Sequence, residues 1–142
     1  MENTPAPLLL AVACEAGDEV GVARIIAANR DISAQLAGDL LARLPEVAEL
    51  NNARGVKLML DAGWDSRAAS DAGVTALHWA AFHGNAGMVR GLLSNGADVH
   101  ATDRNFGGTP LGWAQHGAKN SWHRETGNYP VVFDAISAAG GS

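Results

Sequence analysis

The side chains of this sequence that are best suited to catalysis or metal binding belong to its five histidines. All five lie in the second half of the chain, at His78, His83, His100, His116 and His123. Neutral imidazoles bind zinc, and a histidine beside a carboxylate or a tyrosine can act as a general acid or base. No two of these histidines have the close H-x-x-x-H spacing of two ligands on one helix. We therefore predict no metal ligand, no catalytic residue and no cofactor, and keep an enzyme only as an alternative.

The aromatic residues share this uneven distribution. Seven of the eight aromatic residues lie within residues 72–142, where Trp79 and Trp113 are 34 positions apart. Residues 1–71 instead hold 11 of the 15 acidic residues and six of the ten basic ones. Exposed tryptophan and phenylalanine gathered on one surface commonly mark an interaction site. A binding site is therefore expected in the second half of the chain.

Composition limits the class of protein further. A net charge of −5 is not typical of nucleic-acid-binding modules, and an apolar content of 47% excludes a disordered chain. The single cysteine, Cys14, excludes a disulfide framework, and no apolar run approaches the ~20 residues of a membrane helix. Residues 6–14 resemble the apolar run of an export signal. Such a signal needs basic residues before that run, whereas the first basic residue of this sequence is Arg24. We predict a cytoplasmic protein with neither a nucleic-acid nor a membrane partner.

A period of 33 or 34 residues runs through the chain. Leucine recurs at separations of 34, 33 and 34 positions, at Leu10, Leu44, Leu77 and Leu111. A second apolar pair recurs with the same period, and three residues after each pair comes Asn29, Gly63 or Gly96. Asn and Gly tolerate the left-handed backbone that ends many helices. The pattern predicts repeated units of a short helix, a tight turn, a second helix and a turn-rich connector.

The third unit, GVTALHWAAFHGNAGMVRGLLSNGADVHATD at residues 73–103, resembles an ankyrin repeat almost position for position. Residues 107–114, GGTPLGWA, restart the same pattern, whereas the first two units match it only in their apolar skeleton. Thr75 is placed to cap a helix, and His78 to bond back to Thr75 and tie adjacent connectors. The TALHWAA and FGGTPLGWA motifs also resemble ankyrin proteins of bacteria, whose partners are generally undefined.

The resemblance implies an all-α fold, an ankyrin-repeat α-solenoid of about four helix-turn-helix units with turn-rich connectors. We expect one domain over residues 1–142, with units at about 5–38, 39–71, 72–105 and 106–140. The fourth unit departs from the pattern, because Gly112 replaces the histidine equivalent to His78. It is also longer by about ten residues, within residues 117–129. This inter-helix insertion is expected to form a surface loop, and such loops often carry function.

The ankyrin resemblance implies that the inner helices line a concave surface that binds other proteins. Exposed positions there are expected second, fifth and sixth after the repeated leucine. They include Glu15, Glu46 and Glu49 in the first two units and aromatic or histidine residues in the last two. With three residues of the insertion, the predicted binding residues are Trp79, Phe82, His83, Trp113, His116, Trp122, His123 and Tyr129. We predict a non-catalytic module that binds a protein or peptide through this aromatic and histidine patch.

Three other readings stay open. Trp79 and Trp113 could pack under the connectors and only stabilise the stack. They could also join the histidines and the 117–129 loop in a small-molecule or enzymatic pocket, which an enclosed cavity of several hundred Å³ would favour. Finally, apolar residues of the last helix could point outward and form a homodimer through the C-terminal unit, namely Val131, Val132, Phe133 and Ile136.

Overall fold

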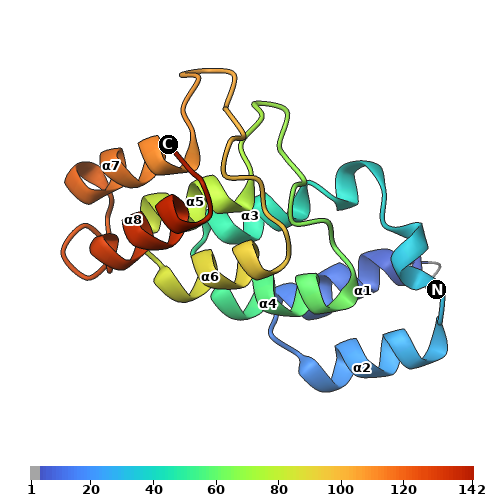
Figure 1. The fold of residues 1–142 in the computed structure, drawn as a ribbon. Helices are drawn as coiled ribbons and strands as arrows, with labels where there is room; N and C mark the ends of the chain where they lie inside the picture. Colours follow the sequence, from blue (N-terminus) through green and yellow to red (C-terminus); the bar gives the residue numbers. More distant parts are fainter. Residues whose placement is uncertain (1–3) are drawn as a thin grey trace.

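The computed structural model describes residues 4–142, where regular structure is helical apart from one isolated bridge between Ala69 and Thr75. Within these residues the chain forms eight α-helices and two short 3-10 helices (Figure 1). In chain order they are α1 (Ala6–Glu15), α2 (Glu19–Ala28), η1 (Ile32–Gln35), η2 (Gly38–Leu40), α3 (Arg43–Glu49), α4 (Ala53–Ala62), α5 (Ala76–His83), α6 (Ala86–Ser94), α7 (Pro110–Asn120) and α8 (Tyr129–Ala138). The predicted all-α fold class is confirmed.

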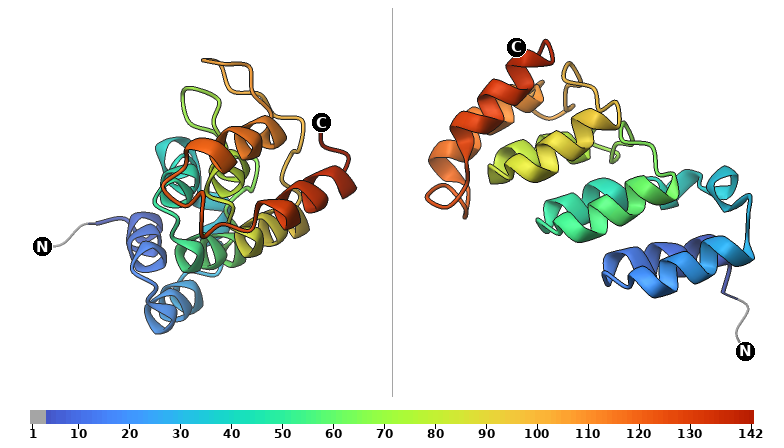
Figure 2. Two further views of the ribbon diagram at one scale, coloured as in Figure 1. Left: turned by 90° about the vertical axis from the view of Figure 1, so that its left-hand side faces the viewer. Right: turned by 60° about the horizontal axis from the view of Figure 1, so that its bottom comes forward.

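The α-helices form four pairs that stack in layers, α1 with α2, α3 with α4, α5 with α6, and α7 with α8 (Figure 2). Helices α3, α5 and α7 pack on one another in an inner row, and α4, α6 and α8 pack in an outer row. The connectors that precede α5 and α7 project as loops from the same side of the stack (Figure 1). This arrangement is the predicted helical solenoid, and each predicted unit contains one pair of helices.

Three of the four repeated leucines lie in the core of the stack, and the fourth, Leu111, packs against the core half-buried. Leu10, Leu44 and Leu77 have no solvent exposure, and neither have the small residues Ala80 and Ala81, which let neighbouring helices approach closely. Burying one leucine side chain stabilises the folded state by roughly 2 kcal/mol. The period of the sequence is therefore the period of the hydrophobic core.

The outer helices begin at polar caps and end, in two cases, at left-handed glycines. Each of the first three begins after a side chain that accepts a hydrogen bond from the backbone N–H three residues on, from Asp18, Asn52 and Asn85. Gly63 and Gly96 follow α4 and α6 with φ angles of 114° and 85°, as predicted. Asn29 is an exception with a φ of −138°, and its side-chain amide donates to the Ile25 carbonyl instead. The left-handed stop predicted after α2 is wrong.

His78 forms the predicted tie between connectors. The backbone N–H of Thr75 donates to Nδ1 of His78 at 3.0 Å, and Nε2–H of His78 donates to the carbonyl of Gly108 at 2.9 Å. The hydroxyl of Thr75 in turn accepts from the backbone N–H of His78, which completes a capping box at the start of α5. This neutral imidazole therefore fastens α5 to the connector that leads into α7.

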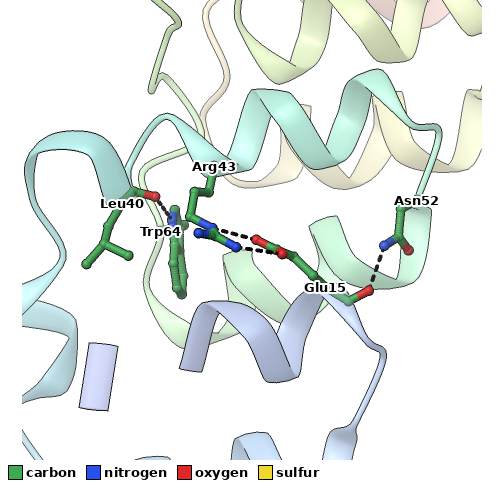
Figure 3. Close-up of polar contacts among 5 residues, drawn as sticks. All are labelled: Glu15, Leu40, Arg43, Asn52 and Trp64. Atoms are coloured by element: carbon green, nitrogen blue, oxygen red, sulfur yellow. Dashed lines mark hydrogen bonds and ion pairs between the residues drawn. The ribbon is translucent and has the colours of Figure 1, made fainter. Parts of the chain in front are cut away.

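Polar contacts join the first two helix pairs (Figure 3). The carboxylate of Glu15, at the end of α1, accepts two hydrogen bonds from the guanidinium of Arg43 at 2.6 and 2.7 Å. The backbone carbonyl of Glu15 accepts another from the side-chain amide of Asn52 at 2.9 Å. The indole N–H of Trp64 donates to the carbonyl of Leu40 at 2.8 Å. Glu15 is therefore half-buried and engaged with Arg43, so it is less exposed than expected.

Replacing Glu15 with glutamine is expected to lower the free energy of unfolding by about 1 kcal/mol, because the two-pronged contact with Arg43 loses its charge. Urea denaturation followed by circular dichroism measures the change. Glu19→Gln is the matched control, since its contact with Arg54 at 2.9 Å joins two exposed side chains and should contribute little. Equal losses in the two variants would contradict a specific role for Glu15.

Candidate functional site

Two tryptophans from adjacent inner helices meet on the inner-helix face. Trp79 lies on α5 and Trp113 on α7, and their ring centroids are 5.1 Å apart with 84° between the ring planes. Both side chains are half-buried, so part of each indole remains open to solvent. The spacing of 34 residues predicts this neighbourhood, and the structure confirms it. Edge-to-face contacts of this kind stabilise a fold by about 1 kcal/mol beyond the area they bury.

A buried carboxylate fixes the position of Trp113. Asp103, which is 3% exposed, accepts hydrogen bonds from the indole N–H of Trp113 at 3.0 Å and from the backbone N–H groups of Gly108 and Phe106, each at 2.8 Å. Burial by itself would raise the pKa of Asp103, but the hydrogen bonds from Trp113 and the two amides outweigh it, so the pKa is lowered. Asp103 therefore stays ionised beneath the connector and orients the indole.

Phe82 extends the cluster toward the C-terminal loop. Its ring centroid lies 5.8 Å from that of Trp79, 6.2 Å from that of Trp113 and 6.3 Å from that of Trp122. The ring of His116 stacks on Phe82 at 6.0 Å with 25° between the planes. His116 is exposed, and Trp122 is 79% exposed. We refer to Trp79, Phe82, Trp113, His116 and Trp122 as the aromatic patch.

A recess of about 450 Å³ opens on the aromatic patch and is lined by Trp79, Phe82, Phe106, Gly108, Gly112, Trp113 and His116. Gly112 stands where the preceding unit has His78, and a Cβ atom at this position would meet only the hydroxyl of Thr109, at 3.7 Å. The glycine therefore leaves open the space that an imidazole would fill. Its departure from the repeat pattern creates part of the recess.

A second recess, of about 320 Å³, adjoins the first and shares with it Trp79, Phe106 and Trp113. Its lining includes the carboxyl groups of Glu46, Glu49 and Asp103. No lysine or arginine among the described residues lines either recess. The inner-helix face thus combines aromatic rings with negative charge.

The connector residue Phe106 belongs to both recesses and is 85% exposed, although sequence analysis gives it no binding role. One signal in the sequence could have identified it. The connector DRNFGG, at residues 103–108, is one residue longer than the period requires, which displaces its tip from the standard course. The hydrogen bond between Asp103 and Trp113 is not predicted either, because an aspartate in a connector gives no sign of a partner indole ten residues away.

The amino-acid sequence matches the model of a known family. The sequence model described as ankyrin repeats in three copies covers residues 10–103 and 44–121 of the chain. The chain belongs to the ankyrin-repeat family. The α-solenoid predicted from the resemblance is confirmed, and the family indicates a protein–protein interaction module.

Curated proteins match a part of this ankyrin-repeat chain. It is 38% identical over 58 residues to a putative palmitoyltransferase, ZDHHC13, of Danio rerio, a match that covers 41% of this chain and 9% of that protein. It is also 38% identical over 56 residues to the palmitoyltransferase ZDHHC17 of Homo sapiens, covering 39% of this chain and 9% of the relative. The matched segment thus spans under a tenth of these relatives. No helix within residues 4–142 is long and apolar enough to cross a membrane.

Two predicted binding residues of the ankyrin-repeat module are buried. His83 is 2% exposed, because the last turn of α5 points its ring at the end of α3, where Nε2–H donates to the carbonyls of Glu49 at 2.8 Å and Ala48 at 3.1 Å. Tyr129 is 5% exposed, and its hydroxyl donates to the carbonyl of Phe82 at 2.6 Å. The expected exposure of both residues is wrong, and each joins neighbouring helices instead.

The loop between the two helices of the fourth ankyrin unit is shorter than the predicted insertion at residues 117–129. Helix α7 continues to Asn120, so the loop spans residues 121–128. The backbone N–H of Asn128 donates to the carbonyl of Gly84 at 2.8 Å, which holds the loop against the end of α5. His123 is half-buried, with its ring 5.2 Å from that of His83. Of the predicted loop residues, only Trp122 is therefore exposed and part of the aromatic patch.

The histidines other than His78 are dispersed over three environments. His116 stacks on Phe82, His123 lies against the buried His83, and His100 is exposed on a connector. Within residues 4–142 no three His, Cys, Asp or Glu side chains gather in a way that could hold a metal ion.

The single cysteine, Cys14, is fully buried in α1. Burial, with a smaller effect of Glu15, raises the pKa of its thiol to about 12. Its thiol is therefore protonated and shielded at neutral pH.

Gly117→Ala is expected to destabilise the protein by about 1–3 kcal/mol, since a Cβ atom there would collide with the backbone of Phe82 and push α7 away from α5. Gly91→Ala, in α6, is the control, because a Cβ atom there meets nothing within 4 Å. It should stabilise the helix by roughly 0.5–1 kcal/mol. Thermal unfolding measures both changes, and a stabilising Gly117→Ala would contradict the close packing of α5 and α7.

Acidification below about pH 6.5 is expected to destabilise the fold. Burial lowers the pKa of His78 and of His83, and hydrogen bonds to carbonyl oxygens offset only part of the effect. The unfolded chain, with histidine pKa values of about 6.5, then binds more protons than the folded one, so stability is full above that pH and declines below it. Urea denaturation at pH 7.5 and 5.5 measures the difference.

His83→Gln should reduce this pH dependence, because glutamine does not titrate. His100→Gln, at an exposed connector position, is the matched control and should keep the dependence of the wild type. A wild-type protein equally stable at the two pH values would contradict the burial of two neutral histidines.

Proposed function

We propose that this chain is a non-catalytic ankyrin-repeat module that binds a protein or peptide through its aromatic patch. One observation carries the proposal: Trp79, Phe82 and Trp113 form a connected cluster of rings beside an open recess of about 450 Å³. Aromatic side chains dominate the energy of many protein interfaces, because they bury a large area and lose little conformational entropy. The patch offers three such anchors at fixed positions.

Packing inside the chain explains only part of this cluster. A ring serving only the stack needs no open side, yet Trp79 and Trp113 are half-buried, and Phe106 and Trp122 are 85% and 79% exposed. Contiguous exposed aromatic surface on a folded protein commonly marks an interaction site. Fixed inner indoles and exposed outer rings therefore favour recognition together with packing.

A small-molecule site is the second candidate function. The larger recess has a volume within the usual range for ligand pockets, about 300–1,000 Å³. However, the loop at residues 121–128 contributes no lining residue to it, so no lid closes over a ligand. The short match to palmitoyltransferases covers 9% of their length, and we assign no transferase activity from it.

We also infer a cytoplasmic protein, since the chain has one shielded thiol and no other cysteine, and a protein partner in preference to a nucleic acid, since the net charge is −5. The resemblance of its motifs supports a bacterial type. Homodimerisation through α8 has less support, because Val132 and Ile136 are completely buried in the stack and only Val131 and Phe133 are half-exposed.

The double variant Phe106→Ser/Trp122→Ser tests the proposal with little risk to the fold, because both side chains are mostly exposed. Unfolding free energy should change by about 0.5 kcal/mol or less, whereas capture of partners from a cell lysate should fall at least about fivefold. Val20→Ser, which removes a 68% exposed apolar side chain from α2, is the matched control. Quantitative mass spectrometry compares the captured proteins. Equal capture by the wild type, the double variant and Val20→Ser would contradict the proposal.

A further inference from the structure

The partner of the aromatic patch can be specified by its charge. Resting on the binding function proposed above, we propose that the partner is a basic peptide segment, one arginine of which inserts at the junction of the two recesses. The junction is formed by Trp79, Trp113 and Phe106, which line both recesses. Aromatic faces and unpaired carboxylates meet there.

The negative side of the junction is provided by three carboxyl groups. Glu46 and Glu49 are exposed on α3, and Asp103 is buried at the base of the connector. Among residues 4–142, no lysine or arginine forms an ion pair with any of them. The exposed carboxylates of Glu46 and Glu49 are therefore available to a cation that approaches the inner-helix face, and the buried Asp103 adds to the negative potential there. Like-charged segments are repelled.

Neighbouring cations of the chain do not pair with these carboxylates. The guanidinium of Arg43, one turn before Glu46, is held in the two-pronged contact with Glu15, and it attracts Glu46 without forming an ion pair with it. Arg104 follows Asp103 directly, but it is exposed, lines neither recess and forms no ion pair within residues 4–142. The chain thus does not supply from its own side chains the cation that this surface favours.

The indoles provide the second half of the recognition. A cation over the face of a tryptophan is attracted by its electron density, and arginine does this more often than lysine. The indole N–H of Trp113 already donates to the ionised Asp103, which increases the electron density of the ring. A planar guanidinium can stack on such a ring and donate to a flanking carboxylate at the same time, whereas an ammonium group acts as a point charge.

The groove between the outer helices shows that charge alone does not make such a site. That groove, of about 570 Å³, is lined by Glu19, Arg54, Lys57 and Asp61 among others. Its charges neutralise one another, since Arg54 pairs with Glu19 at 2.9 Å and Lys57 with Asp61 at 3.0 Å. No aromatic ring lines it within the described part of the chain. Unbalanced negative charge beside aromatic rings distinguishes the inner-helix face.

A selection from a random dodecapeptide library displayed on phage tests the inference. Peptides selected by the wild-type chain are expected to be enriched in arginine at least about threefold over the unselected library. Glu46→Gln/Glu49→Gln should abolish the enrichment. Glu19→Gln/Asp61→Asn removes the same charge from the outer groove and should keep it. Enrichment that persists in the first variant or disappears in the second would overturn the inference.

Synthetic peptides then measure the contribution of the guanidinium. A blocked nonapeptide with one central arginine, of a sequence taken from the selection, should bind about tenfold more tightly than the same peptide with citrulline or lysine, by tryptophan fluorescence. Equal affinities would overturn the inference. Selected peptides that lack arginine, and whose binding is lost in Phe106→Ser/Trp122→Ser, would overturn the inference but support the proposed binding function. Selected peptides that bind this variant as well as the wild type would overturn the inference and the proposed function.

Discussion

The inner-helix face depends on the hydrogen bonds that the buried carboxylate of Asp103 accepts. This carboxylate accepts hydrogen bonds from the indole of Trp113 and from two backbone N–H groups of its own connector, at 3.0, 2.8 and 2.8 Å. A charged group with 3% exposure is stable only when its oxygens are satisfied in this way. Removing any of the three donors would leave the buried charge with too few hydrogen bonds and destabilise the fold. The connector, the indole and the carboxylate must therefore reach their positions together.

Asp103 acts within a wider chain of contacts that crosses two repeats. His78, on α5, donates to the carbonyl of Gly108, whose N–H group donates to Asp103. The ring of His78 also lies 5.1 Å from that of Trp113. Because the same connector residue binds both repeats, the two tryptophans are held at a fixed separation. A solenoid has contacts only between neighbouring units, so this local tie is what can make one part of its surface rigid.

The period of the sequence predicts the helices, the burial of Leu10, Leu44 and Leu77, and the contact between Trp79 and Trp113, because each follows from a position in a repeat. The ankyrin resemblance adds the tie formed by His78. It does not predict the burial of His83, which depends on the carbonyl groups at the end of α3, or of Tyr129, whose hydroxyl reaches Phe82 from 47 residues away. Both contacts join residues distant along the chain, one between the second and third units and the other between the third and fourth. A repeat pattern describes what the units share and carries no information on contacts formed by only one of them.

The two halves of the chain differ because their polar groups have different partners. In the first half, Glu15 and Glu19 are satisfied by Arg43 and Arg54, so part of the acidic excess of the sequence is structural. Toward the fourth unit, Gly112 replaces the histidine of the motif, and the space it leaves becomes a recess between aromatic rings. A missing side chain is thus as important as those present. Glu46 and Glu49, which form no ion pair within residues 4–142, line the adjoining recess and place negative charge beside the aromatic rings.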